Sequence, residues 1–535
     1  MNDLIHFFRH DIDIISVMTF FPCLGALFVL CWPRRHEEWT RWIALAGSAA
    51  PLFFIWKILR YYDPATAGIQ FSNKMPWIDT IRVDYFVGVD GLSIAMVLLV
   101  SILTPLTILG AHHGIALNPG KAGLKPFFAL ILMEQTGLYG AFTALNFFHW
   151  FIFWEVSLVP MFFLIKLYGN GDRTRASYQF FVYTFVGSVM MLIGMQFVYL
   201  ATHSWDLVEL ARMARETAGG TGSSVLAVKI QGLADRLGAP FLAKYSVTAI
   251  FLLVFAGFAV KTPLWPFHTW LPVTYTQAPT AGSMLLTGVM SKMGVYGFLR
   301  IVLPLFGSSV GEYRDILLLL AVATILMGAI AALAQRDLKT MIAYSSVNHL
   351  GYCMLGVFAV TVATGNVNDR ALALNGVIIQ MFAHGLSAAG LFYFAGVIEQ
   401  RTRTREMEAL GGLRKTAPVM CGLMGITMFA SLGLPGLAGF VGEFMIFRGA
   451  FPLAMGITSL AVVGILITAI YLLRMTGLVF FGPQDDKWNG VADLDGREKI
   501  IGGILAALLF WVGLRPDALA RLSNSAVVEM ARFWS

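Results

Sequence analysis

Apolar runs of about 20 residues, the length that one helical membrane crossing needs, recur along this chain and constrain its fold more than any other feature. We distinguish about fourteen such runs, far more than a soluble core repeats. They start near Ile14, Trp42, Leu92, Pro126, Phe147, Gln179, Val247, Gly282, Ile316, Met341, Val377, Val419, Ala454 and Ile500. Of the 535 residues, 57% are hydrophobic and only 13% are charged, against about 25% charged in soluble domains. The sequence therefore predicts an all-α polytopic membrane protein with about 14 transmembrane helices.

Basic residues collect in the connections that follow odd-numbered runs, as the positive-inside bias of membrane proteins predicts. After the fifth, ninth and eleventh runs these residues are Arg173, Arg175, Arg336, Lys339, Arg401, Arg403 and Arg405. We therefore expect the odd-numbered connections to face the cytoplasm and both termini to face the opposite side. The same bias accounts for the net charge of +7, so the expected partner is the lipid bilayer and not a nucleic acid.

Two of the predicted helices contain sequences that break an α-helix. The seventh run contains residues 261–266 (Lys-Thr-Pro-Leu-Trp-Pro), and the twelfth contains residues 433–436 (Gly-Leu-Pro-Gly). Proline removes a backbone donor and clashes with the preceding turn, so the helix kinks or unwinds there. Unwound backbone at membrane depth is tolerated only where protein or a water-filled cavity satisfies its polar groups. The simpler alternative is that the prolines produce ordinary kinks.

The two breaks lie five runs apart, and a titratable residue lies close to each, Lys261 and Glu443. This pattern is typical of inverted repeats, whose ion sites lie at discontinuous helices. We therefore predict two inverted five-helix repeats, each with a discontinuous helix. The chain would divide into a three-helix N-terminal addition, the first repeat (runs 4–8), the second repeat (runs 9–13), and a last run with a C-terminal amphipathic segment: 1–122, 123–305, 306–482 and 483–535.

Charged residues inside the apolar runs are the strongest functional candidates: Glu155, Lys261, Lys292 and Glu443. A charge at the centre of a bilayer costs about 3 kcal/mol or more, so it is rarely retained without a function. Because both signs occur, the pattern favours the transfer of ions or protons. Glu134, inside the fourth run, is a weaker candidate for the same set. Arg300 ends the eighth run, where snorkelling to the interface is the simpler interpretation.

Polar residues at helical spacing extend this pattern on the tenth and eleventh runs. Two sets each share one helical face: Ser345, His349 and Tyr352, and Gln380, His384 and Ser387. Such faces can line a hydrated proton path, although hydrogen bonds between helices are the simpler interpretation for the serines, glutamine and tyrosine. Paired histidines can also bind haem, but no second pair accompanies these. The four cysteines form no C-x-x-C motif and support neither an iron–sulfur cluster nor disulfides.

These segments resemble the antiporter-like membrane subunits of NADH:quinone oxidoreductase (respiratory complex I) and of the multisubunit cation/proton antiporters. The resemblance extends from about residue 90 to residue 481, and it is strongest in residues 153–161, 258–272, 341–352, 380–392 and 440–444. Glu443 stands where the L and N subunits of complex I usually have lysine, which favours the third antiporter-like subunit.

The resemblance implies a role for each candidate. Lys261 would be the central proton-carrying lysine, and Glu155 its modulating partner. Lys292 would connect this lysine to a hydrophilic axis that contains His349 and His384. Glu443 would be the distal exchange site, and we add three accessory candidates from the polar pattern: Glu134, Tyr352 and Gln380.

The resemblance also implies a subunit of a proton-translocating NADH:quinone oxidoreductase, without a redox centre in this chain. No Rossmann motif or cysteine set is present, so FMN, iron–sulfur clusters and quinone would be bound by partner subunits. The nearest partners would be the antiporter-like L and N subunits, in a bacterial inner (plasma) membrane. A subunit of a multisubunit Na+/H+ antiporter or of a membrane-bound hydrogenase complex is the alternative.

Three positions depart from the pattern of the family. The family often has Asp and His where this chain has Val273 and Tyr275, and an acid where Asn146 stands. We therefore assign these positions no role, and the role of His149 is left open.

Overall fold

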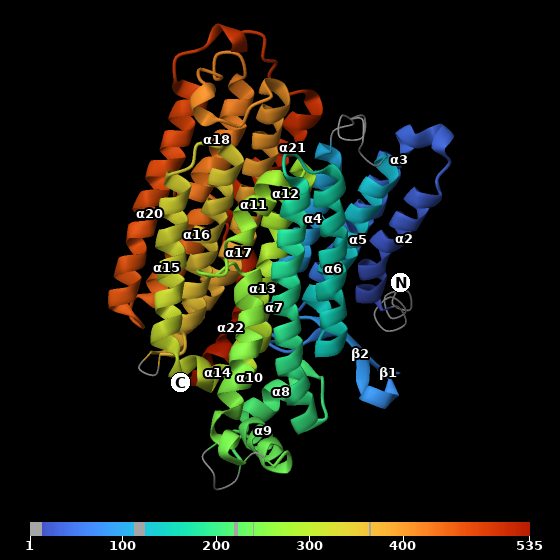
Figure 1. Cartoon of the computed structure of the whole chain (residues 1–535), viewed down its shortest axis with the longest axis vertical. Coiled ribbons are helices and arrows are strands. Elements are labelled where there is room, and N and C mark those ends of the chain that lie inside the picture. The colour runs from blue at the N-terminus through green and yellow to red at the C-terminus, as the bar shows by residue number, and fades with distance from the viewer. Residues whose placement is uncertain (1–12, 112–122, 219–222, 239, 363–364, 535) are drawn as a thin grey trace.

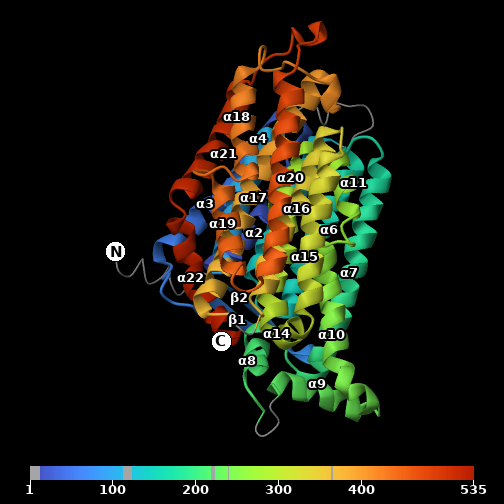
Figure 2. The same cartoon turned by 90° about the vertical axis from the view of Figure 1, so that its left-hand side faces the viewer.

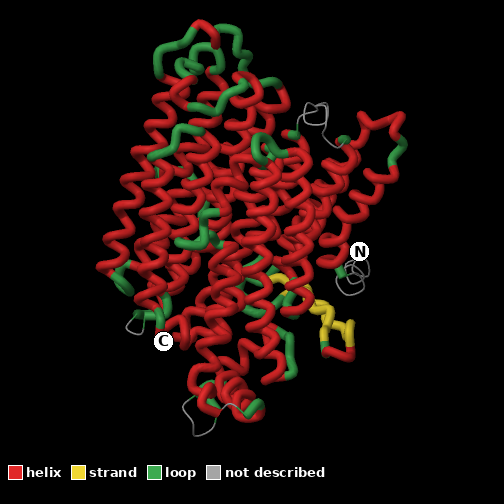
Figure 3. Tube along the Cα trace, in the orientation of Figure 1, coloured by secondary structure: helices red, strands yellow, loops and turns green. Residues whose placement is uncertain are grey.

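The fold is a bundle of long helices that run roughly along the long axis of the molecule (Figure 1). The structure is a computed structural model that describes residues 13–111, 123–218, 223–238, 240–362 and 365–534. Helix dominates the described chain (Figure 3), which confirms the all-α class. A small antiparallel hairpin, β1 (Gln70–Ile78) and β2 (Val83–Val89), lies outside that prediction.

A helix coincides with each of the predicted apolar runs. In chain order the helices are α2 (Ile14–Cys31), α3 (Thr40–Tyr61), α4 (Ile94–Gly110), α5 (Leu124–Thr143), α6 (Phe147–Tyr168), α7 (Arg173–Thr202), α8 (Leu207–Arg215), α9 (Val225–Arg236), α10 (Pro240–Lys261), α11 (Trp270–Gln277), α12 (Thr280–Leu285), α13 (Ser291–Gly297), α14 (Leu303–Glu312), α15 (Arg314–Leu333), α16 (Leu338–Ala359), α17 (Val367–Thr402), α18 (Pro418–Leu432), α19 (Ala438–Ala450), α20 (Met455–Thr476), α21 (Gly496–Leu514) and α22 (Asp517–Ala531). Two π-helical segments, Leu286–Met290 and Phe298–Val302, join α12, α13 and α14 into one long helix.

The count of about fourteen membrane crossings is not confirmed. Among the described residues, nine helices are long and apolar enough to cross a membrane, and the bent pair of α21 and α22 would make a tenth. α4 and α18 have only 17 and 15 residues, fewer than the roughly 20 that a perpendicular crossing needs. The apolar runs therefore predicted where helices form better than how many of them span the bilayer alone.

Both predicted helix breaks occur. α10 ends at Lys261 and α11 begins at Trp270, so α10 lies in the lower half of the bundle and α11 in its upper half (Figure 1). α18 ends at Leu432, the next residue, Gly433, has a left-handed backbone (φ 85°) that favours glycine, and α19 begins at Ala438. The proposed repeats thus each contain five helices with the interrupted one fourth: α5, α6, α7, α10–α11 and α12–α14, and α15, α16, α17, α18–α19 and α20.

The amphipathic segments outside the bundle are α8, α9 and α22. α8 and α9 lie together at the lower end of the molecule in both side views (Figure 1, Figure 2). The apolar side of α8 is buried, including Leu207 and Leu210. α22 packs against α4 and α17 through residues such as Leu519 and Val527.

α17 is the centre of the bundle. It occupies the middle of both views (Figure 1, Figure 2), and its residues from 373 to 398 are buried. α16, α18 and α19 pack around it. A buried helix that carries Gln380 and His384 must find polar partners for them on these neighbours.

Candidate functional site

The predicted site residues lie in the interior of the bundle. They are Glu134 on α5, Glu155 on α6, Lys261 at the end of α10, Lys292 on α13, His349 and Tyr352 on α16, Gln380 and His384 on α17, and Glu443 on α19. All are buried except Glu155, which is half-buried. Lys292 and Glu134 are 0% exposed. Such residues need partners, because an unpaired charge in a low-dielectric interior is strongly destabilising.

Four of these residues form one row across four helices. Lys292 Nζ lies 2.9 Å from His384 Nδ1. The His384 and His349 rings follow, with centroids 5.2 Å apart. His349 Nδ1 lies 2.9 Å from Glu443 Oε1, to which Gln380 also donates a hydrogen bond of 3.2 Å. The row therefore joins a lysine to a glutamate through two imidazoles, which are groups that can both accept and donate a proton.

The two accessory candidates beside the row differ in how they contact it. Gln380 bonds Glu443 directly, as described above. The Tyr352 ring lies 5.8 Å from the His349 ring, centroid to centroid. His349 Nε2 and His384 Nε2 are buried without a hydrogen-bond partner among the described residues. Because buried polar atoms are normally paired, these two nitrogens are the atoms of the row at which water would bind.

Lys261 lies in a second group, with Glu155 and Glu134. Both carboxylates are close enough to Lys261 to interact with it electrostatically, although no ion pair within 4.0 Å joins them among the described residues. Lys261 Nζ instead lies 5.1 Å from the centroid of the Trp154 ring. Neither oxygen of Glu134 has a hydrogen-bond partner in the described chain. Glu134, the weaker candidate by sequence, thus also interacts with Lys261, although less strongly than Glu155.

Glycines bring the helices of the site close together. A Cβ on Gly294, two residues after Lys292, would lie 2.3 Å from Thr262 Oγ1, so α13 packs directly on the end of α10. A Cβ on Gly442, beside Glu443, would lie 2.7 Å from the backbone nitrogen of Gln380. Small residues allow this close approach of membrane helices. A glycine near Lys292 and another beside Glu443 therefore let the helices that carry these residues pack closely against their neighbours.

Replacement of Gly294 by alanine is expected to destabilise the bundle. The added Cβ must displace Thr262 and with it the end of α10, and such overpacking costs about 1–3 kcal/mol. The melting temperature of the purified protein in detergent measures the effect. Gly425→Ala is the matched control, because no atom lies within 4 Å of its Cβ. Equal melting temperatures for the two variants would contradict the close contact at Gly294.

A π-helical segment shapes the surroundings of Lys292. The segment Leu286–Met290 ends just before it, and the carbonyl oxygen of Thr287 accepts hydrogen bonds from Lys292 Nζ and from Ser291 Oγ (3.2 Å). The Thr287 hydroxyl also lies 2.9 Å from Ser346 Oγ on α16. π-Helical turns in membrane and soluble helices often mark functional sites.

The structure changes the interpretation of Arg300 and gives structural contacts to two positions that were assigned no role, Asn146 and Tyr275. Arg300 does not snorkel: it is paired with Asp90 at 2.5 Å, with both side chains largely buried, beside a cavity of about 190 Å³ at the lower end of the bundle. Asn146 caps α6 by accepting from the backbone of Phe148 and His149. The Tyr275 hydroxyl donates to the Leu286 carbonyl at 3.0 Å.

Lys339 and Arg405, interpreted as loop charges that orient the chain, belong to a partly buried network that sequence reasoning missed. Lys339 is 0% exposed and pairs with Glu399 at 2.6 Å. Arg405 pairs with Asp337 at 2.9 Å. The sequence did contain a signal for this network, since opposite charges lie close together in each of the two connections: Asp337 with Lys339, and Glu399 with Arg405.

A membrane bundle whose interior joins lysine, histidine and glutamate in one row is an ion- or proton-conducting membrane protein by class. The sequence model of the family described as "NADH:quinone oxidoreductase/Mrp antiporter, TM" matches residues 144–468, and the chain belongs to this family. The matched residues include the whole Lys292–Glu443 row.

Individual relatives cover nearly the whole chain. NADH-quinone oxidoreductase subunit M of Rhodobacter capsulatus is 34% identical over 530 residues, which are 97% of this chain and 96% of the relative. The F(420)H(2) dehydrogenase subunit M of Methanosarcina mazei is 34% identical over 526 residues, 97% of this chain and 99% of the relative. A chain of respiratory complex I from Thermus thermophilus with bound NADH superposes with a TM-score of 0.82 at 26% identity, covering 97% of this chain and 100% of that one.

Proposed function

We propose that this chain is the proton-translocating antiporter-like subunit of the kind named M, in the membrane arm of an NADH:quinone oxidoreductase. The observation that carries the proposal is the row of Lys292, His384, His349 and Glu443, each within contact of the next. Lys261, with Glu155 and Glu134, would supply the row with protons. A proton taken up at one end can be released at the other because every member can bind and lose one.

The energies involved suit this role. Two opposite charges about 4 Å apart attract by about 4 kcal/mol at an effective dielectric constant of 20. Moving one charge against a membrane potential costs about 2.3 kcal/mol per 100 mV. A glutamate that approaches or leaves Lys261 therefore changes the proton affinity of this lysine by enough to load and expel a proton. Glu155 is the candidate for this movement, because it is half-buried and not fixed by an ion pair within 4.0 Å among the described residues.

Electron transfer belongs to partner subunits in this proposal. The described residues contain no group of three or more His, Cys, Asp or Glu side chains that could hold a metal ion. FMN, iron–sulfur clusters and quinone would be bound elsewhere in the complex, and the L and N subunits would be the neighbours in the membrane. We place the chain in a bacterial inner membrane, with both termini on the periplasmic side, because the basic connections mark the cytoplasmic face.

Separate replacements of Glu155 and Glu134 by glutamine test which of the two carboxylates changes the proton affinity of Lys261 by moving. We expect Glu155→Gln to lower proton translocation about tenfold, because the amide cannot change the proton affinity of Lys261. Glu134→Gln should lower it less, because Glu134 is fully enclosed and cannot change its distance from Lys261 as easily. NADH-driven acidification of inverted membrane vesicles measures both. The reverse order of the two effects would make Glu134 the modulating residue.

Purification of the complex from its own membranes tests the function as a whole. An NADH:quinone oxidoreductase contains flavin and iron–sulfur centres and acidifies vesicles when NADH and quinone are supplied. Uptake of ²²Na⁺ in exchange for protons, without oxidation of NADH, would instead identify a Na+/H+ antiporter. A nickel centre with hydrogen-dependent proton transfer would identify a hydrogenase complex. Either of the last two results would overturn the proposal.

A further inference from the structure

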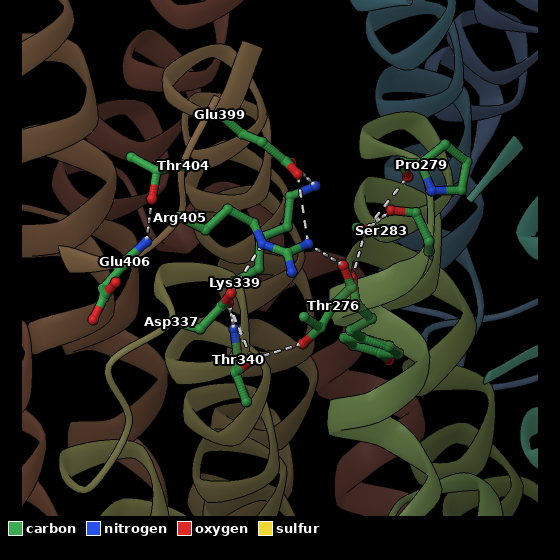
Figure 4. A network of polar contacts seen from close by, with 12 residues as sticks. Thr276, Pro279, Ser283, Asp337, Lys339, Thr340, Glu399, Thr404, Arg405 and Glu406 are labelled. Atoms are coloured by element: carbon green, nitrogen blue, oxygen red, sulfur yellow. Dashed lines mark hydrogen bonds and ion pairs between the residues drawn. The ribbon is translucent and has the colours of Figure 1, made fainter. Parts of the chain in front are cut away.

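A balanced cluster of charges lies where the connections after α15 and α17 meet the second half of the interrupted helix, α11 (Figure 4). It consists of Asp337, Lys339, Glu399 and Arg405, two acids and two bases. Backbone hydrogen bonds fix the two connections to each other: Leu338 N donates to Arg405 O at 2.8 Å, and Met407 N donates to Arg336 O at 2.9 Å. The cluster is therefore built into the fold at this end of α16 and α17, the helices that carry His349 and His384.

Within the cluster, exposure to solvent decreases from Glu399 to Lys339. Glu399 is 22% exposed and can exchange protons with solvent, whereas Lys339, 2.6 Å away from it, is fully buried. Arg405 Nη1 lies 3.5 Å from Glu399 Oε1 and 3.0 Å from the carbonyl oxygen of Thr276 at the end of α11. A guanidinium stays protonated under all physiological conditions, so Arg405 holds the other groups in place and does not take part in proton transfer. Lys339 and Glu399 are the members that can exchange one.

Polar groups continue from Lys339 toward the row of the functional site. Ser346 lies seven residues after Lys339, on the same face of α16 and about 10 Å further along it. Its hydroxyl is 2.9 Å from that of Thr287, and the carbonyl of Thr287 accepts from Lys292. Water molecules must bridge two steps of this path, from Lys339 to Ser346 and from the Thr287 hydroxyl to Lys292 Nζ, because a backbone carbonyl has no proton to pass on.

We propose that the Lys339–Glu399 pair collects protons from the cytoplasmic face and passes them along α16, through Ser346 and Thr287, to Lys292. This inference rests on the proposed function and adds the residues through which protons enter. The ammonium of Lys339 gives one proton to the neutral amine of Lys292 through the hydroxyls and water. Glu399 then takes a proton from solvent and returns it to the Lys339 amine, so that one proton enters for each one passed on. Asp337 and Arg405 are the other charged groups that face Lys339.

Two substitutions far apart on the path test the proposal in inverted membrane vesicles that contain the whole complex. Glu399→Gln keeps the shape of the side chain but cannot bind a proton, and Ser346→Ala removes one hydroxyl from the interior of α16. We expect each to lower NADH-driven acidification about tenfold. The double variant should show no further loss, because both changes block one path. Glu399→Asp should restore part of the activity.

Two controls distinguish proton entry from assembly. Arg403→Gln lies in the same connection as Arg405 but is exposed, and Ser459→Ala removes an exposed hydroxyl from α20; both should leave acidification unchanged. If Glu399→Gln fails to assemble, the result for Ser346→Ala decides. Normal acidification with Ser346→Ala, in fully assembled complex, would overturn the entry path. If Lys261→Ala also acidified normally, the proposed function itself would fail, so the two failures are distinguishable.

Discussion

Replacement of Lys261 by alanine should leave the complex assembled but lower NADH-driven proton translocation about tenfold or more. The side chain is 2% exposed, ends α10 at the break and lies over the ring of Trp154, and alanine at this position can carry no proton. Assembly should survive because removing a buried charge also removes its desolvation cost. Acidification of inverted vesicles measures the loss, and blue native electrophoresis measures assembly.

Lys244→Ala is the matched control for this substitution. Lys244 lies near the other end of α10, is exposed, and its Nζ lies 5.6 Å from the centroid of the Tyr245 ring. It should translocate protons normally. A Lys261→Ala complex that also translocates normally would remove Lys261 from the mechanism.

Replacement of Glu443 by glutamine is the second substitution with a large expected effect. Glu443 accepts hydrogen bonds from both His349 and Gln380, and the amide cannot take over a proton from the imidazole. Proton translocation should fall about tenfold, because the row then ends at a group that does not titrate. The contact of Lys292 with His384 should persist, so the fold and the first half of the row remain intact.

The exposed Glu408, which pairs with Arg336 and Arg474 on the surface, serves as the control. Exposed ion pairs contribute little to stability, about 0–1 kcal/mol, and Glu408→Gln should leave translocation unchanged. If Glu443→Gln translocated protons as well as Glu408→Gln, Glu443 would be a structural partner of His349 and not an exchange site.

Much of the fold could be predicted from the sequence because membrane helices leave a direct signal in it. Each apolar run coincides with a helix, and prolines and glycines marked both interruptions. The signal does not show how many helices cross the membrane. α4 and α18 are apolar, but with 17 and 15 residues they are shorter than a typical crossing of about 20 residues. It also fails for the β1–β2 hairpin, whose strands are partly exposed and lie outside the apolar runs.

The candidate site was predicted residue by residue, but its connections were not. The free-energy cost of placing a charge in the membrane was enough to single out Lys261, Lys292 and Glu443, because this cost arises in whichever direction the side chain points. The same reasoning undervalued Lys339, since a lysine at the start of a helix ordinarily reaches solvent, and here it is fully buried against Glu399.

The sequence by itself determined where helices form, where two of them break and which side chains must be charged or titratable inside the membrane. Only the tertiary structure decided which of those side chains meet. His384 is 92 residues from Lys292, and Glu443 is 94 residues from His349, yet each pair is 2.9 Å apart. Hydropathy along a chain indicates which residues prefer the interior of the bilayer, but it does not indicate which residues contact one another in space. Those contacts depend on how the helices pack, for example where Gly442 lies against Gln380.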